Sequence, residues 1–160
     1  MKILPYRPNV CIFLLNKKNE LLIAERLNYN NIWQLPQGGV EPEFTVEENV
    51  LKETNEETGI SKSLLKIEKK LLATHTYDFG GSETPEYFKN KFRGQAQTFW
   101  IVRFLGKDSD INLATEEPEF QNYQWIDPSH LLDIAEHIRI PGYSKALPEV
   151  LDFIKNIKSK

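Results

Sequence analysis

The chain has very little cysteine: Cys11 is the only one among 160 residues. A single cysteine excludes an internal disulfide, and its position in an apolar run favours a buried structural thiol over a reactive one. His75, His130 and His137 show no metal-ligand spacing with Cys11 or with one another. We therefore interpret the histidines as structural.

Long hydrophobic runs are also missing. No apolar stretch is long enough to span a bilayer, and residues 1–5 lack the apolar core of a signal peptide. We therefore expect no membrane association and a cytoplasmic location. The sequence has no low-complexity segment, linker or internal repeat, so residues 1–160 are expected to form a single domain with its own hydrophobic core.

Charge of neither sign dominates. The chain has 20 Lys and Arg residues against 23 Asp and Glu residues, for a formal net charge of −3. This balance argues against broad wrapping of nucleic acid, duplex DNA included, because such binding needs a basic surface. It leaves room for a small basic pocket that binds only a polyphosphate end. The sequence gives no indication of an oligomeric state.

A dense group of acids is the most informative feature that is present. Glu53, Glu56 and Glu57 are spaced i, i+3 and i+4, so in a helix they share one face. Three negative charges there repel one another, have no salt partner of their own and lie toward the helix C-terminus, where the macrodipole disfavours anions. A divalent cation would neutralise such a cluster, because carboxylate oxygens are natural ligands of Mg²⁺. The alternative is a solvated acidic face.

Local signals predict the helix that carries these acids, roughly residues 46–58. Thr45 and Glu48 fit a capping box at its start, and Gly59 fits the position just past its end. Residues that recur every four positions predict one buried face: Val46, Val50 and Thr54.

This helix and the turns around it resemble the Nudix box, here residues 38–60. The box pattern is Gly, five residues, Glu, seven residues, Arg-Glu, an aliphatic residue, any residue, Glu-Glu, any residue, Gly and an aliphatic residue. The matching positions are Gly38, Glu53, Glu56, Glu57, Gly59 and Ile60.

Three positions depart from the box. Phe44 replaces the first Glu, and the neighbouring Glu43 can partly substitute if the loop is shifted by one residue. Lys52 keeps the charge of the usual Arg but not its planar fork, so Glu53 is expected to be less firmly oriented. Thr54 replaces an aliphatic residue, and its methyl group can still pack. The metal-binding acids remain, which favours reduced rather than abolished activity.

Segments outside the box are similar to one branch of the family, the bacterial RNA pyrophosphohydrolases and plant-type dinucleoside polyphosphate hydrolases. In that branch an acid matching Glu119 completes the metal site or serves as base. Without the resemblance, Glu119 is interpreted as a solvated loop acid beside Glu116 and Glu117. The similar segments are residues 6–10, 33–39, 94–97 and 118–120.

The resemblance implies an α/β (α+β) fold, a three-layer α/β/α sandwich with a mixed β-sheet. It implies metal-dependent hydrolysis of a pyrophosphate bond. Our first choice is removal of pyrophosphate from 5′-triphosphorylated RNA ends, and the alternative is asymmetric cleavage of diadenosine tetraphosphate or a related dinucleoside polyphosphate. Mg²⁺ is the implied cofactor, for which Mn²⁺ or another divalent cation can substitute. A rival is a Nudix-fold module that binds nucleotide or RNA and has lost catalysis through Phe44 and Lys52.

Roles for individual residues follow from the same resemblance. Glu53, Glu56 and Glu57 are expected to hold the metal, and Gly38 belongs to the same set. Either Glu56 or Glu119 takes the proton of the attacking water, and the sequence does not choose between them. Lys52 stands at the catalytic position of the usual Arg.

Six residues are expected to contact the substrate: Arg7, Arg26, Gln37, Gln95, Gln97 and Tyr77. The two arginines can bind phosphate bidentately or stack on a base, or else form surface salt bridges. Two of the glutamines alternate on a predicted strand, where they line a polar cleft or face solvent. The tyrosine, and equally Tyr143, can stack on a purine, although a core position is commoner.

The remaining elements follow from local patterns. Strands are expected at residues 10–15 and 21–25, which form a hairpin, and at 32–36, 66–77, 95–104 and 123–126, with a loop at 78–94. Asp127 and Pro128 predict the start of a helix with residues 131, 132, 134 and 135 on its apolar side. Residues 140–142 are expected to break the chain before a C-terminal helix at 143–157.

Overall fold

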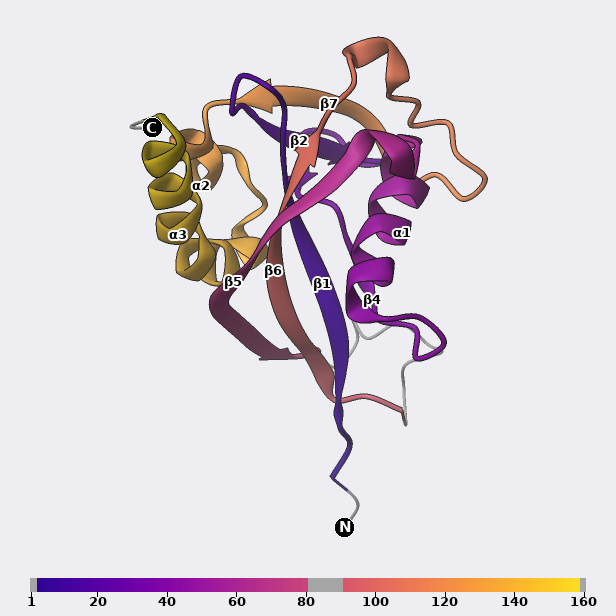
Figure 1. The fold of residues 1–160 in the computed structure, drawn as a ribbon. Coiled ribbons are helices and arrows are strands. Elements are labelled where there is room, and N and C mark those ends of the chain that lie inside the picture. The colour runs from indigo at the N-terminus through magenta and orange to yellow at the C-terminus, as the bar shows by residue number, and fades with distance from the viewer. Residues whose placement is uncertain (1–2, 81–90, 159–160) are drawn as a thin grey trace.

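A central mixed β-sheet lies between two helical layers. The computed structural model describes residues 3–80 and 91–158. Helix α1 (Val46–Thr58) covers one face of the sheet, and helix α3 (Ile140–Lys158) covers the other (Figure 1). The expected three-layer α/β/α sandwich is confirmed.

Within the described residues the sheet has seven strands, and one pair of them is parallel. Strand β1 (Tyr6–Leu15) runs parallel to β6 (Gly94–Phe104), and the other pairings are antiparallel. The main order is β3-β2-β1-β6-β5, while β4 pairs with β1 and β7 pairs with β2. The other bounds are β2 Leu21–Arg26, β3 Trp33–Gln34, β4 Gln37–Gly39, β5 Leu65–Asp78 and β7 Phe120–Ile126.

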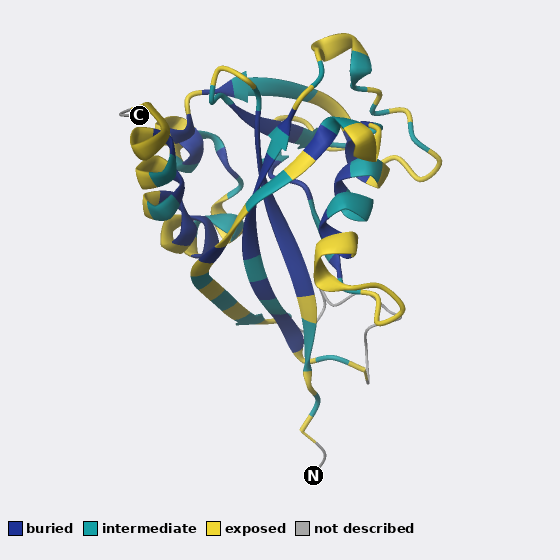
Figure 2. Ribbon diagram, in the orientation of Figure 1, coloured by how far each residue is buried: buried dark blue, intermediate teal, exposed yellow. Residues whose placement is uncertain are grey.

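Strand β1 is buried on both faces, as its continuous apolar sequence requires. Alternate side chains enter the core cluster under α3: Cys11, Phe13 and Leu15. The others enter the core cluster under α1: Val10, Ile12 and Leu14. Figure 2 shows this strand as a buried band between the two helical layers. The cysteine is the buried structural thiol that the sequence predicted, and burial raises its pKa to about 12.

Tyr143 belongs to the core under α3 and is fully buried. Its hydroxyl oxygen accepts a hydrogen bond from the backbone N–H of Leu35 at 2.9 Å. A ring held in this way cannot stack on a purine, so the commoner of the two predicted roles is the correct one.

The C-terminal part of the chain differs most from the sequence prediction. Residues 140–142 do not break the chain but form the first turn of α3, where Pro141 needs no backbone N–H. The helix expected after Asp127 is reduced to a 3₁₀ turn, Pro128–His130, and the short helix α2, Leu131–Ile134. Ala135 is already extended and forms an isolated bridge with Trp33, so pairing to the sheet ends the helix early.

The strands agree with the prediction more closely. The hairpin and the two long strands are confirmed, but β1 and β7 begin earlier than expected. The strand expected at residues 32–36 is limited to β3, and β4, which follows it, was not predicted. Much of the expected loop at 78–94 lies outside the described residues. Further 3₁₀ turns span Lys62–Leu64, Asp108–Asp110 and His137–Arg139. No helix in the described ranges is long and apolar enough to cross a membrane.

Both ends of α1 carry the caps that the sequence predicted. Thr45 Oγ1 accepts from the Glu48 N–H at 3.1 Å, and the Glu48 carboxylate accepts from the Thr45 N–H at 3.0 Å. These bonds lower the pKa of Glu48. Gly59 ends the helix with φ of 73°, a left-handed conformation that favours glycine. Val46 is 38% exposed and was wrongly placed on the buried face, because the first turn of α1 extends past the core.

Replacing the capping hydroxyl should weaken the fold measurably. We expect Thr45→Ala to lower the free energy of unfolding by about 1 kcal/mol, because the Glu48 N–H loses its acceptor. Ser61→Ala is the matched control, since Ser61 precedes a 3₁₀ turn but makes no side-chain capping bond. Urea denaturation of the three proteins measures the difference. Equal effects of the two substitutions would contradict the capping assignment.

Candidate active site

Two cavities contain most of the predicted site residues, and Gln37 links them. The acidic cavity, of about 550 Å³, is formed by α1, the turn before it and the loop before β7. The polar cavity, of about 580 Å³, is lined by residues of β2, β4, β5 and β6 and of the segment before α3. The Gln37 N–H donates to Glu57 of the acidic cavity at 3.1 Å, while its side-chain carbonyl accepts from Gln97 of the polar cavity at 2.9 Å.

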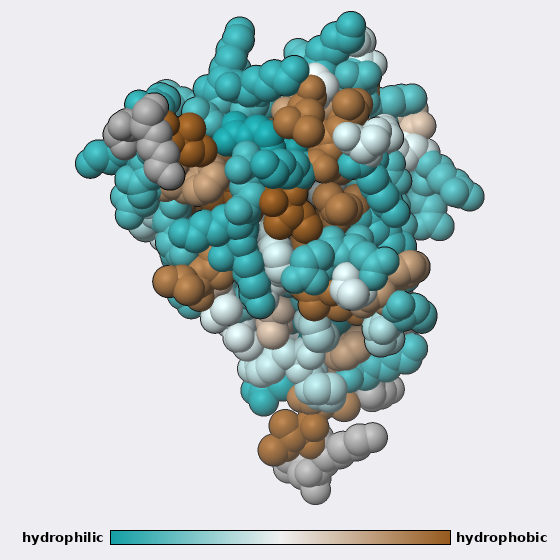
Figure 3. Space-filling model, viewed as in Figure 1, coloured by the Kyte–Doolittle hydropathy of each residue, from teal (hydrophilic) through white to brown (hydrophobic). Residues whose placement is uncertain are grey.

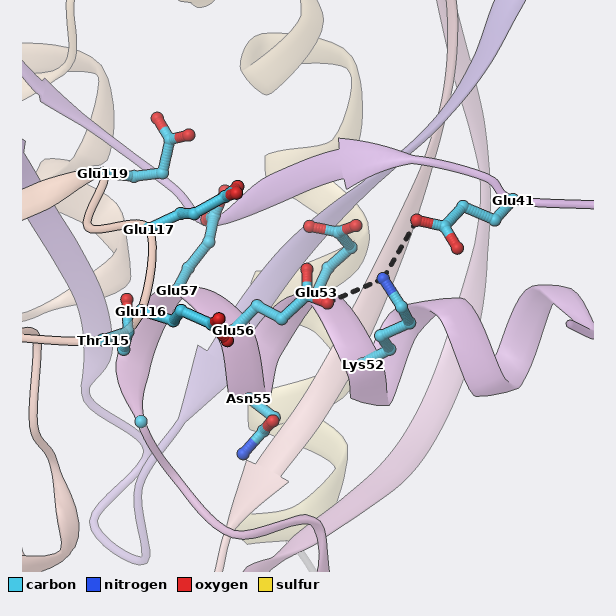
Figure 4. Close-up of a pocket in the computed structure, with 11 residues that line it drawn as sticks. Glu41, Lys52, Glu53, Asn55, Glu56, Glu57, Thr115, Glu116, Glu117 and Glu119 are labelled. Atoms are coloured by element: carbon cyan, nitrogen blue, oxygen red, sulfur yellow. Dashed lines mark hydrogen bonds and ion pairs between the residues drawn. The ribbon is translucent and has the colours of Figure 1, made fainter.

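The acidic cavity brings together all the residues predicted to be catalytic: Lys52, Glu53, Glu56, Glu57 and Glu119. Figure 4 shows the four carboxylates and the lysine along with Glu41, Glu116 and Glu117. The first four residues come from one face of α1, as the i, i+3 and i+4 spacing predicted. Glu119 comes from a loop more than fifty positions away, beside the helix end.

Two of the α1 acids are strongly perturbed. Glu57 is only 8% exposed, and burial together with the charge of Glu53 raises its pKa well above the usual value. Burial and the charge of Glu56 raise the pKa of Glu53 to about 7, and Lys52 partly offsets this. A Cβ at Gly38 would lie 2.1 Å from the Glu53 carboxylate, so a larger residue there would displace this side chain.

Lys52 overturns one expectation, because the acids do have a salt partner. Its Nζ lies 2.7 Å from Glu56 and 3.1 Å from Glu41. Its direct ion pairs are thus with these two acids rather than with Glu53, which the sequence analysis took it to orient. The lysine reaches both because one neighbour follows it by one helical turn and the other lies in the turn before α1.

Glu41 is a site residue that the sequence analysis missed. It lines the acidic cavity, whereas Glu43, the acid proposed as a substitute for the first Glu of the box, does not. Asn49 fixes Glu41 in place: its side-chain oxygen accepts from the Glu41 N–H at 2.9 Å, and its amide donates to the Glu41 carbonyl at 3.1 Å. Phe44 is 40% exposed, with the Lys52 ammonium 5.9 Å from its ring centroid. The sequence did contain a signal for the position of Glu41: an amide within a helix, here Asn49, can bind the backbone of the preceding loop.

The carboxylates of the acidic cavity suit a divalent cation, although their oxygen atoms do not converge on one point. Within residues 3–80 and 91–158, no three His, Cys, Asp or Glu side chains lie close enough to hold a metal ion. Glu53, Glu56 and Glu57 nevertheless supply the oxygen donors that Mg²⁺ prefers. Two of them have raised pKa values because burial and mutual repulsion disfavour their charge, which a cation would offset.

The polar cavity is built on a buried network of amides. The Gln97 amide donates to Asn9 at 3.1 Å as well as to Gln37, and the Asn9 amide donates to Gln95 at 3.1 Å. Gln95 in turn donates to the hydroxyl of Tyr77. The two glutamines of β6 therefore face a polar cavity rather than bulk solvent. Asn9 was missed, because its neighbours in the network lie far from it in sequence.

The predicted arginines occupy different positions. Arg26 lines the polar cavity, with its guanidinium 4.5 Å from the ring centroid of Tyr29. Arg7 lines neither cavity. It packs against Gly39, where a Cβ would meet its guanidinium at 2.0 Å, and donates to Gln95 at 3.4 Å. Its charge still lowers the pKa of Glu53.

Two further residues of the polar cavity went unrecognised in the sequence. Arg139 donates to Gln34 at 3.3 Å and lies 3.6 Å from the Glu136 carboxylate. His75, interpreted as structural, also lines the cavity. Neither carries a local motif, because the cavity is assembled where β5 meets the segment before α3.

The comparisons with known proteins agree on the family. The NUDIX domain matches residues 5–148. The RNA pyrophosphohydrolase of Zymomonas mobilis subsp. mobilis is 42% identical over 147 residues, which cover 91% of this chain and 95% of that protein. The RNA pyrophosphohydrolase of Roseobacter denitrificans is 39% identical over 132 residues, covering 81% and 82%.

Solved structures share the fold at low identity. A Caenorhabditis elegans Ap4A hydrolase in a binary complex superposes with a TM-score of 0.64 at 20% identity, covering 92% of this chain and 98% of that one. The dihydroneopterin triphosphate pyrophosphohydrolase of Escherichia coli gives a TM-score of 0.66 at 13% identity, with 92% and 99% covered. At these identities the likeness shows the fold alone.

The buried charge of Glu57 should make the metal-free protein sensitive to pH. Its pKa is raised on folding, so the folded protein binds the proton of this carboxyl more tightly than the unfolded chain does. The stability that results is complete below about pH 4.5, and it is lost as the pH rises from there through the pKa of the folded state. Glu57→Gln keeps an acceptor for the Gln37 N–H and removes the charge. With chelator present, we expect the variant to gain unfolding free energy over the wild type at pH 8, with a smaller gain at pH 5.

Urea denaturation at the two pH values measures this effect. Glu47→Gln is the matched control, since Glu47 is exposed in the first turn of α1 and lines neither cavity. A Glu57→Gln protein that is less stable than the wild type at pH 8 would show that the carboxylate supports the fold.

Proposed function

The chain belongs to the NUDIX family, and on that premise we propose that it is a metal-dependent pyrophosphohydrolase that removes pyrophosphate from 5′-triphosphorylated RNA ends. One observation carries the proposal: Gln37 joins the acidic cavity to the polar cavity. We assign the reacting phosphates to the first of these cavities and the nucleoside to the second, and the shared Gln37 supports this pairing. The relatives of this name align along most of their length, which supports the same reaction.

The polar cavity is assigned to the first nucleotides of the substrate. Its volume of about 580 Å³ lies within the range of small-molecule sites, about 300–1,000 Å³. We assign base and phosphate contacts to the residues that line it: Arg26, Gln37, Tyr77, Gln95 and Gln97. Arg7 supports this wall through Gly39 and Gln95 instead of facing the cavity.

The acidic cavity is assigned to the metal and the reacting phosphates. Hydrolases of this family generally use divalent cations, and we assign Mg²⁺ to Glu53, Glu56 and Glu57 with Gly38 beside them; Mn²⁺ can substitute. A divalent cation, when bound, offsets the charge of phosphate oxygens and lowers the pKa of a water ligand.

Glu119 is our choice for the base that takes the proton of the attacking water. Lys52 already holds the Glu56 carboxylate at 2.7 Å, which leaves that acid less able to turn toward a substrate. The Glu119 carboxylate makes no hydrogen bond or ion pair with any other residue in the described ranges. It lines the same cavity from the loop before β7, and its side chain is free to turn toward the attacking water.

A dinucleoside polyphosphate such as diadenosine tetraphosphate is the second candidate substrate. It also presents a purine nucleoside followed by a polyphosphate, and the solved Ap4A hydrolase shares the fold. A binding module without catalysis is less favoured, because Phe44 and Lys52 leave the acids of the cavity in place. We propose a cytoplasmic location, where RNA 5′ ends occur.

Incubation with three substrates tests the function. With Mg²⁺ present, we expect the purified protein to convert 5′-triphosphorylated RNA to 5′-monophosphorylated RNA and pyrophosphate. We expect slower turnover of diadenosine tetraphosphate and of nucleoside triphosphates, and no turnover after exhaustive chelation. Activity without metal would contradict the assignment of the acids, and faster turnover of diadenosine tetraphosphate would make it the main substrate.

The first acid of the site is predicted to be Glu41 in place of the missing box Glu. Glu41→Gln should raise the Mg²⁺ concentration for half-maximal rate by about tenfold, because a charge that lines the cavity and binds Lys52 is lost. Glu43→Gln is the matched control and should leave the requirement unchanged. A larger effect of the Glu43 substitution would restore the shifted-loop arrangement that the sequence suggested.

A further inference from the structure

His75 and Lys145 form a polar pair at the edge of the polar cavity. His75 lies on β5 and Lys145 on α3, two elements that pack side by side (Figure 1). The lysine Nζ is 2.9 Å from His75 Nδ1. An ammonium group has donors but no acceptor, so Nδ1 must accept, and the ring proton of a neutral His75 resides on Nε2. Burial and the charge of Lys145 lower the pKa of His75, which favours this neutral form.

The imidazole ring is held on its other sides as well. It stacks on Tyr77 with the ring centroids 5.9 Å apart and an interplanar angle of 24°. A Cβ at Gly142 would lie 3.0 Å from His75 Cδ2 and 3.3 Å from the side-chain oxygen of Gln97. Gly142 therefore lets α3 approach closely and places Lys145, three positions later, beside the ring. Nε2 has no hydrogen-bond partner among the described residues, so its N–H can bind a ligand.

The charges around this pair favour an anion. Two ion pairs nearby are already balanced: Arg139 pairs with Glu136, and Asp78 pairs with Arg93. Lys145 makes no ion pair with any residue of the described ranges, and its side chain is exposed. A lone ammonium and a neutral N–H donor suit a singly charged phosphate better than the highly charged polyphosphate, which belongs with the metal-binding acids.

The exposed apolar residues give no comparable site. Leu72 is 89% exposed and Ile3 is 79% exposed. The face in Figure 3 shows apolar residues in small separate groups between hydrophilic ones. By contrast, His75 lines a cavity, and its ring is held by Tyr77 and by the Lys145 ammonium.

We propose that His75 and Lys145 form a subsite for the phosphodiester that follows the first nucleotide of an RNA substrate. The inference rests on the proposed function, because it assigns the first nucleotides to the polar cavity. A nucleoside triphosphate and diadenosine tetraphosphate contain no phosphodiester. The pair would therefore favour RNA ends over these smaller substrates.

Kinetics on two substrates tests the subsite. His75→Phe keeps a ring to stack on Tyr77 and removes the donor, and Lys145→Met removes the ammonium while keeping the chain length. For triphosphorylated RNA we expect KM to rise about tenfold in each variant with little change in kcat, since one charge-assisted hydrogen bond is lost. For diadenosine tetraphosphate KM should stay unchanged. Lys145→Arg should restore the RNA KM, and Lys155→Met, elsewhere on α3, should behave as wild type.

Binding of a 5′-monophosphorylated dinucleotide gives a readout that needs no turnover. We expect about tenfold weaker binding by His75→Phe and Lys145→Met, and no change for a nucleoside monophosphate. Equal losses on RNA and diadenosine tetraphosphate, or unchanged dinucleotide binding, would overturn the subsite. Failure of the wild type to hydrolyse RNA while the dinucleotide binding difference persists would overturn the proposed function alone.

Discussion

The buried carboxylate of Glu57 is the interaction on which the arrangement of both cavities depends. It lies near the C-terminus of α1, almost fully covered, and accepts a hydrogen bond from the Gln37 N–H. A buried charge without a partner is costly, so the fold has to hold this group in place by other means. The same bond fixes β4 against α1, and Gln37 then carries the connection into the amide network of the polar cavity.

The structure meets this cost by anchoring the helix at several points. Val50 packs into the core, and the hydroxyls of Thr54 and Thr58 donate to carbonyls one turn earlier, so these buried polar groups are satisfied. The cap at Thr45 and the left-handed Gly59 fix the two ends. With the backbone held in this way, the acids stay crowded despite their repulsion, which is the condition that favours binding of a cation.

The two cavities divide the chemistry according to charge. Carboxylates dominate the first cavity, whereas amides, aromatic rings and side chains of both charges line the second. Glu41 shows how the departures from the box are accommodated, because Lys52 bridges it to Glu56. The lysine that replaces the usual Arg therefore forms one of its ion pairs with a residue of the turn before α1. Glu136 pairs with Arg139 and Asp78 pairs with Arg93, which leaves Lys145 and Arg26 to attract an anionic substrate.

The sequence by itself determined the α1 acids, the caps and most strands, because each depends on local spacing or on periodic burial. The three-layer fold was implied by the resemblance to the Nudix family. Glu53, Glu56 and Glu57 share a face through helical geometry alone. Prediction from the sequence failed where long-range packing overrode local signals. Helix α2 is an example, because the bridge between Ala135 and Trp33 shortens it.

Only the tertiary structure decided which groups meet across elements. Lys52 pairs with Glu41, Asn9 joins the glutamines of β6, and His75 meets Lys145 only because β5 packs beside α3. A sequence records no distances between such residues. The contacts of Asn9 follow from the register of β1 with β6, and the contact of His75 with Lys145 follows from the close approach of α3 at Gly142.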